Sequence, residues 1–301
     1  MRKSKLILTF SVTLFVCAVD QSVGSEAEQI IQRYLKMPHP KDASFNEARI
    51  ARRNVLAELK AMPEQAIRAI GRTLPEVENP RQRCELASML GDYFHTEESA
   101  ALLCGLLQDP DEKVRWQAIH GLRMMARRTA RSGGKRIQRR PDFVPKVQGL
   151  VPYLVSAAGD KAERNRVSAL YALADTRDPS AVSEMRNLLK DQSEKVRLYA
   201  ACFLTEYQDA AGLPEMRNAL NRCRSIDVKR LAVELDYSYY HEAELLLASL
   251  ERITGKSFGP IPLNPTLCSD LRRMQDIKRR YKSLLDTWAE WWAWEPKDEE
   301  K

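Results

Sequence analysis

Few residues of this chain have the types and spacing that catalysis requires. The sequence has no GxSxG, HExxH, phosphate-loop or GxGxxG motif, which are the common signatures of hydrolases, zinc proteases and nucleotide-binding enzymes. The cysteines show no CxxC or Cys/His spacing that would favour a zinc site. The histidines are scattered and stand at His39, His95, His120 and His241. We therefore expect no enzyme activity, no metal and no cofactor.

Basic and aromatic residues are better candidates, and the chemistry they favour is binding. Seven Arg and Lys residues fall within 127–140, in a glycine-containing stretch that we interpret as an insertion over 127–143. The spacing of four, three and four residues puts four preceding side chains on one stripe of a helix. Trp and Arg are frequent interface anchors, and a basic loop attracts anionic partners. The candidate partner-binding residues are Trp116, His120, Arg123, Arg127, Arg136, Arg139 and Arg140.

Each feature also has a structural alternative without a partner. The basic segment is also typical of a solvated loop. The alternative for Trp116 is packing against a neighbouring element.

A repeated pattern predicts the elements that position these residues. The spacing Asp-x5-Arg-x2-Ala-x3-Leu occurs three times, beginning at Asp109, Asp160 and Asp191. Degenerate copies run from Glu78 to Gly91, with Ala87 in the alanine place, and from Cys223 to Ala232, with Lys229 for the arginine. Aspartate ends one helix and caps the next, while the small alanine lets helices approach. Each unit is thus an antiparallel helix pair whose apolar face is buried only by stacking.

These units resemble the HEAT repeat, in the short bacterial form also seen in phycobilisome-lyase-like proteins, over roughly residues 44–255. The resemblance implies an all-α solenoid of stacked antiparallel helix pairs whose second helices line a concave face. It also implies a structural ladder between units, formed by Asp109, Arg115, Asp160, Arg166, Asp191 and Arg197. The lone pair His241-Glu242 does not reproduce the repeated His-Glu ligands of HEAT-type di-iron hydroxylases.

The helical pattern divides the chain into segments with distinct expected roles. Helices at 26–36 and 45–61 form an N-terminal cap over 25–62, with Pro38 and Pro40 between them. The solenoid covers 63–255. Its first helices are expected at 63–74, 96–107, 144–158, 179–190, 212–221 and 242–254, and its second helices at 80–94, 111–130, 161–175, 193–207 and 225–240.

The last segment, 256–301, departs from the repeat and is interpreted as a linker and a capping helix. An ITGxxFG stretch begins at Ile253, and a WxxWW cluster begins at Trp288. This ending resembles that of exported HEAT proteins from planctomycete-type bacteria. The tryptophans are expected to cover the last repeat, and the alternative is a membrane-interface or partner-binding role.

Residues 1–24 have the features of a secretory signal, with basic residues followed by the apolar stretch from Leu6 to Val19. We therefore expect export to the periplasm or cell envelope. Lipidation at Cys17 stays an alternative that we do not favour, because Val16 stands where a small residue is needed. Removing this segment deletes three basic residues and one acidic residue, which lowers the formal charge from +7 to +5.

Together these patterns predict a non-enzymatic exported scaffold that binds a protein or another anionic macromolecule on its concave face. We do not favour nucleic acid, and we expect membrane contact only through a lipidated start or the Trp-rich end. The alternative is a HEAT-like nucleic-acid-binding protein, of the base-excision type, if the signal segment is not real. Cysteine pairing (Cys84 with Cys104, Cys202 with Cys223) and the oligomeric state stay open.

Overall fold

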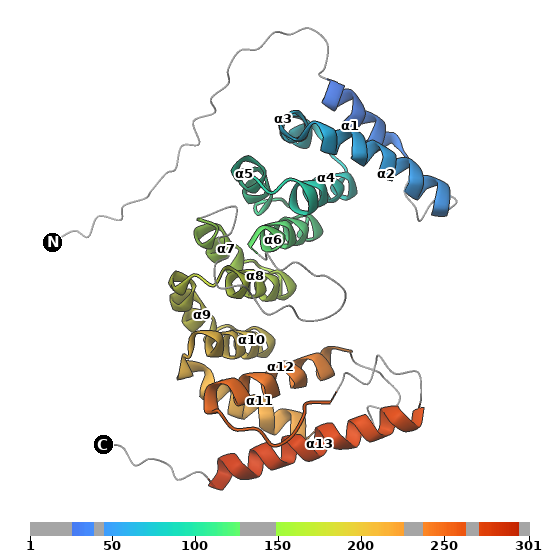
Figure 1. Ribbon diagram of the computed structural model, residues 1–301. Coiled ribbons are helices and arrows are strands. Elements are labelled where there is room, and N and C mark those ends of the chain that lie inside the picture. Colours follow the sequence, from blue (N-terminus) through green and yellow to red (C-terminus); the bar gives the residue numbers. More distant parts are fainter. Residues whose placement is uncertain (1–25, 39–44, 127–148, 226–236, 263–270, 295–301) are drawn as a thin grey trace, which may run out of the picture. The chain divides into compact units, whose positions relative to one another are not determined.

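A computed structural model describes residues 26–38, 45–126, 149–225, 237–262 and 271–294 (Figure 1). These residues contain thirteen α-helices and no strand, which confirms the expected all-α fold. The helices are α1 (Glu26–Lys36), α2 (Phe45–Ala61), α3 (Pro63–Thr73), α4 (Pro80–Tyr93), α5 (Glu97–Leu106), α6 (Glu112–Ala126), α7 (Val151–Ala158), α8 (Glu163–Thr176), α9 (Val182–Leu188), α10 (Glu194–Leu204), α11 (Leu213–Ser225), α12 (Tyr237–Thr254) and α13 (Leu271–Trp294).

The chain divides into two compact units, residues 1–69 and 70–301. In the first unit, α1 packs on α2 and buries Ile30 and Ile31 of α1 with Leu59 of α2. Arg33 of α1 forms an ion pair with Glu58 of α2. The bounds of α1 and α2 coincide with those expected from the sequence.

In the second unit, helices pair and the pairs stack. α5 packs on α6, α7 on α8 and α9 on α10, while α4, α6, α8 and α10 contact one another in order (Figure 1). The contact between α4 and α6 is very close at Gly91, where an added Cβ would lie 2.3 Å from the Cα of Gly121. Two glycines facing each other explain why this pair of second helices can approach so closely.

Several expected helix bounds differ from those observed. Residues 144–148 of the expected helix 144–158 lie outside the described residues, and α7 begins at Val151, because Gly149 has a φ of 73° and Pro152 stands in the first helical turn. The expected boundary between 225–240 and 242–254 is wrong, since α12 runs without a break from Tyr237 to Thr254. The helix expected at 179–190 begins with a 3-10 turn and is α-helical only over Val182–Leu188.

The end of the unit is closed by α13. One apolar cluster joins Cys202 of α10, Leu220 of α11 and Leu247 of α12 to Tyr281 and Trp288 of α13. Tyr281 donates a hydrogen bond of 2.7 Å to the carbonyl oxygen of Pro262, which ties the segment after α12 to α13. The helix that the sequence indicated as a cap therefore covers the last helix pairs.

Candidate binding surface on the second helices

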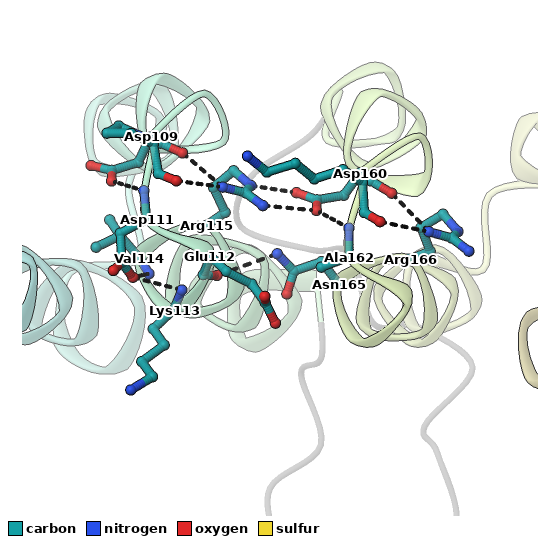
Figure 2. Close-up of polar contacts among 12 residues, drawn as sticks. Asp109, Asp111, Glu112, Lys113, Val114, Arg115, Asp160, Ala162, Asn165 and Arg166 are labelled. Atoms are coloured by element: carbon teal, nitrogen blue, oxygen red, sulfur yellow. Dashed lines mark hydrogen bonds and ion pairs between the residues drawn. The ribbon is translucent and has the colours of Figure 1, made fainter.

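A ladder of charged side chains connects successive helix pairs (Figure 2). Arg115 of α6 donates two hydrogen bonds to Asp160, from Nε to Oδ2 at 2.6 Å and from Nη2 to Oδ1 at 3.1 Å. Its Nη1 also donates to the carbonyl oxygens of Asp109 and Pro110 at 2.9 and 3.1 Å. Arg166 of α8 repeats this arrangement one unit later with Asp191, at 2.8 and 2.9 Å. One guanidinium thus joins the loop of its own unit to the loop of the next.

The aspartates of the ladder also shape the loops in which they lie. Asp160 Oδ1 accepts a hydrogen bond of 2.8 Å from the backbone N–H of Ala162, two residues ahead of it. Burial alone raises the pKa of Asp160, but the hydrogen bonds from Arg115, Ala162 and Asn165 outweigh it and hold that pKa below its usual value. The hydrogen bond to Asp160 raises the pKa of Arg115. Both groups are therefore charged at neutral pH.

The ladder begins one unit earlier than the sequence pattern indicated. Arg83 of α4 donates to Asp109 at 2.7 and 2.9 Å and to the carbonyl oxygens of Val77 and Glu78. Aligning Ala87 with the repeat alanine put Cys84 in the arginine column, so the alignment of that unit was wrong by one residue. The signal that would have found Arg83 is its distance of 26 residues from Asp109, close to the 25 residues between Arg166 and Asp191.

At the other end the ladder changes partner. Arg197 keeps its bonds to its own loop, the carbonyl oxygens of Asp191 and Gln192, at 2.9 and 3.2 Å. Its Nε then donates to Glu215 of α11 at 3.3 Å instead of to an aspartate of a further repeat. The degenerate copy expected from Cys223 to Ala232 lies mostly outside the described residues.

Three of the predicted partner-binding residues, Trp116, His120 and Arg123, lie on α6, and two of them contact α8. The rings of Trp116 and His120 stack at 5.4 Å with 16° between their planes. The guanidinium of Arg164 lies over the Trp116 ring, 4.3 Å from its centroid. Arg123 forms an ion pair of 2.7 Å with Asp175 of α8. The predicted residues Arg127, Arg136, Arg139 and Arg140 lie outside the described residues.

An aromatic cluster that sequence reasoning missed extends the same surface over α8, α10 and α12. Tyr171 is at its centre, with Arg123 over its ring at 4.4 Å and with edge-on contacts to Tyr199 and Phe203 at 5.4 and 4.8 Å. The Tyr171 hydroxyl lies 2.6 Å from Nε2 of His241. Burial raises the pKa of Tyr171 to about 12, so the phenol stays protonated. We call the half-buried residues Trp116, His120, Arg123, Tyr171, Asp175 and His241 the second-helix surface.

One sequence signal would have pointed to Tyr171. It stands five residues after the ladder arginine Arg166, as His120 stands five residues after Arg115. Equivalent positions on successive second helices share a face, so the sequence predicts that Tyr171 lies on the same face as His120.

The C-terminal tryptophans belong to the cap. Trp288 is fully buried and makes an edge-on contact of 4.8 Å with Phe258 of the ITGxxFG stretch. Trp291 contacts both rings, and Arg217 of α11 lies over Trp292 at 5.0 Å. Gly255 and Gly259, with φ of 68° and 122°, permit the turns that bring Phe258 onto α13.

The cysteines of the described residues are free thiols: Cys84, Cys104, Cys202 and Cys223. Burial raises the pKa of each, to about 11 for Cys84 and Cys223 and to about 12 for Cys104 and Cys202. A thiolate is the nucleophile and the metal ligand, so these cysteines are protonated and unreactive at neutral pH.

The described ranges contain neither a metal-binding cluster nor a helix that could span a membrane. Within them, no three His, Cys, Asp or Glu side chains gather as they would around a metal ion. No described helix is both long and apolar enough to cross a bilayer.

Comparisons with known proteins point to helical repeats. Residues 151–235 match the family model described as HEAT repeats. Among solved structures, the protein YibA of E. coli is 12% identical, with 87% of this chain and 82% of that chain covered and a TM-score of 0.45. A designed armadillo repeat protein in complex with the peptide (KR)4 is 17% identical, with 76% and 100% covered and a TM-score of 0.42.

Human deoxyhypusine hydroxylase in complex with glycerol is 16% identical, with 87% and 97% covered and a TM-score of 0.25. No protein with a curated description matches the sequence. The HEAT-repeat match over 151–235 and the stacked helix pairs of residues 70–301 together support a HEAT-repeat protein.

Proposed function

We propose that this chain is an exported, non-enzymatic HEAT-repeat scaffold that holds a protein or another anionic macromolecule on the second-helix surface. The observation that carries the proposal is that polar and aromatic side chains from successive units are fixed against one another there. Arg123 with Asp175, and Arg164 with Trp116, each join α6 to α8.

Fixed side chains matter because binding otherwise costs conformational entropy. Each flexible side chain that is immobilised at an interface costs roughly 0.5–1.5 kcal/mol. Here, the stack of Trp116 on His120 and the bond from Tyr171 to His241 already restrict these rings in the free chain. A partner that docks on them meets a preorganised surface made of the residue types that most often anchor interfaces.

The polar groups on this surface pair with one another, and this favours a binding role for the surface over a catalytic one. The Asp175 carboxylate is tied to Arg123, and the Tyr171 phenol is protonated. A general base needs a carboxylate, imidazole or phenolate free to reach a substrate. Export is proposed from the signal-like residues 1–24, and it places the partner in the periplasm or envelope.

The test is site-specific photocrosslinking in the organism's own envelope fraction. A crosslinker replaces Gln117 of α6 or Ser168 of α8, which are half-exposed at equivalent places on successive second helices. The control replaces the exposed Gln108 in the loop after α5. We expect one discrete product from both second-helix positions and none from the control.

Affinity measurements on the identified partner then complete the test. Arg123→Ala should weaken binding, while Arg186→Ala, which removes a similar ion pair to Asp209 on the first-helix side, should not. Equal crosslinking at all three positions would refute the proposed surface. A crosslinked nucleic acid would favour the nucleic-acid-binding alternative instead.

A further inference from the structure

The exposed side of α13 carries a dense group of positive charges in its first half. Six of the twelve residues from Leu271 to Lys282 are Arg or Lys, and one is acidic. Five of these cations are exposed, and the sixth, Lys278, is buried. We call the exposed five the α13 basic face: Arg272, Arg273, Arg279, Arg280 and Lys282.

Helical periodicity separates this face from the core. Ile277, Tyr281 and Leu284 are buried against the cap cluster, so the α13 basic face points to the opposite side of the helix. It extends over about 15 Å of the helix axis, at 1.5 Å per residue. α13 is the last helix of its unit, and it packs on α11 (Figure 1).

Neutralisation within the fold is weak at Arg279 and Lys282 of this face. Arg279 has a side chain that is 76% exposed and lies 3.8 Å from Asp276. Lys282 lies 3.5 Å from Asp286, a carboxylate that also binds Arg224 of α11 at 3.1 Å. Exposed pairs of this length contribute little, and much of the positive field reaches solvent.

Helix stability does not explain this distribution of charge. The helix dipole favours acidic residues in the first turn and basic residues in the last. α13 has no acidic residue in its first turn, where Arg272 and Arg273 stand, and no basic residue in its last. Residues that oppose local stability are expected where a function requires them.

We propose that the α13 basic face docks on the surface of an anionic lipid bilayer. This inference goes beyond the proposed function, because it concerns a different surface and a different class of partner. Basic residues near an anionic membrane surface bind it electrostatically without inserting an apolar segment.

Two features favour a bilayer over other polyanions. The face is one side of a single helix, and its charges follow that side for about 15 Å, which suits a planar sheet of headgroups. Protein partners are usually held by buried aromatic anchors, and single-stranded nucleic acids by stacking platforms. The aromatic rings of α13 described here, Tyr281, Trp288, Trp291 and Trp292, lie on its core side or are half-buried against neighbours.

The test is vesicle cosedimentation with the chain from residue 25 onward, so that the apolar stretch Leu6 to Val19 does not itself bind lipid. Vesicles contain phosphatidylcholine alone or with about one third phosphatidylglycerol. The test variant is Arg279→Gln with Arg280→Gln. The control is Arg53→Gln with Arg68→Gln, two exposed arginines of α2 and α3 that change the net charge equally.

We expect binding to the anionic vesicles only, with loss at high salt. Each removed cation should lower the partition coefficient about fivefold, so the test variant should bind about 25-fold more weakly than the parent. The control pair should bind within about twofold of the parent, because α2 and α3 contribute no residue to the α13 basic face.

Three results would overturn the proposal: equal binding to neutral vesicles, an equal loss in both pairs of variants, or tighter binding to duplex DNA than to the anionic vesicles. Arg123→Ala should leave vesicle binding unchanged. The second-helix surface and the α13 basic face are therefore tested independently.

Discussion

Removing Arg115 should destabilise the repeat array much more than removing Arg197. The side chains of Arg115 and Asp160 are each only 6% exposed, and Arg115→Ala leaves the Asp160 carboxylate buried without its guanidinium. Breaking a buried ion pair in this way costs about 3–5 kcal/mol. Arg197 is 23% exposed and meets Glu215 at 3.3 Å, so Arg197→Ala should cost only about 1–2 kcal/mol.

The pH dependence of unfolding tests the same ion pair in a second way. In the parent, the pKa of folded Asp160 lies below its unfolded value of 3.8, so its stabilising contribution is present above that pH and is lost as the pH falls through the folded pKa. In Arg115→Ala, we expect burial to outweigh the remaining hydrogen bonds from Ala162 and Asn165 and to raise the folded pKa of Asp160 above its unfolded value. Protonation of Asp160 should then partly restore the stability of the variant as the pH falls towards the unfolded pKa of 3.8.

Urea unfolding followed by circular dichroism at 222 nm measures both effects, with global fits because repeat arrays need not unfold in two states. The double variant Arg115→Met, Asp160→Leu serves as a control, since it leaves no unpaired charge and should recover most of the loss. Two results would refute the reasoning. One is an equal loss of unfolding free energy in Arg115→Ala and Arg197→Ala, and the other is an Arg115→Ala variant whose stability only decreases as the pH is lowered.

Three further predictions concern packing and the aromatic cluster. Gly91→Ala should destabilise the chain by more than about 2 kcal/mol in urea unfolding, whereas Gly105→Ala, where a Cβ meets nothing within 4 Å, should be neutral or stabilising. Trp288→Ala should cost about 3–5 kcal/mol and increase hydrogen exchange in α11 to α13, and unchanged exchange there would argue against a cap. Tyr171→Phe should cost about 1 kcal/mol and move the imidazole NMR resonances of His241, and unmoved resonances would contradict their hydrogen bond.

Much of the fold could be predicted because its determinants are local. The helix bounds of α1 and α2 follow from periodicity and from the prolines between them, Pro38 and Pro40. The repeated Asp and Arg positions can be recognised in the sequence because the Arg follows the Asp by the same six residues in each unit. The start of α7 at Val151 depends on the positive φ of Gly149, which periodicity does not reveal.

The site was harder to predict because its contacts cross between units. The sequence predicts that Trp116 is a candidate partner-binding residue. In the structure, the guanidinium of Arg164 from the next second helix lies over the Trp116 ring, and the His120 ring stacks on it. Which residue of α8 faces Trp116 depends on how the two helices are offset, and one sequence does not reveal that offset. The one-residue misalignment at Arg83 arose because this unit has Val77 where the other units have aspartate, and the bond from Arg83 to Asp109 corrects it.

The central claim, that a partner is held on the second-helix surface, is tested most directly by hydrogen exchange with and without the crosslinked partner identified above. Protection by a docked partner slows exchange in the elements that it covers and stabilises. We predict slower exchange in α6 and α8, with little change in α5 and α9. Protection confined to α5, α7 and α9, or absent from α6 and α8 at saturating partner, would contradict the account.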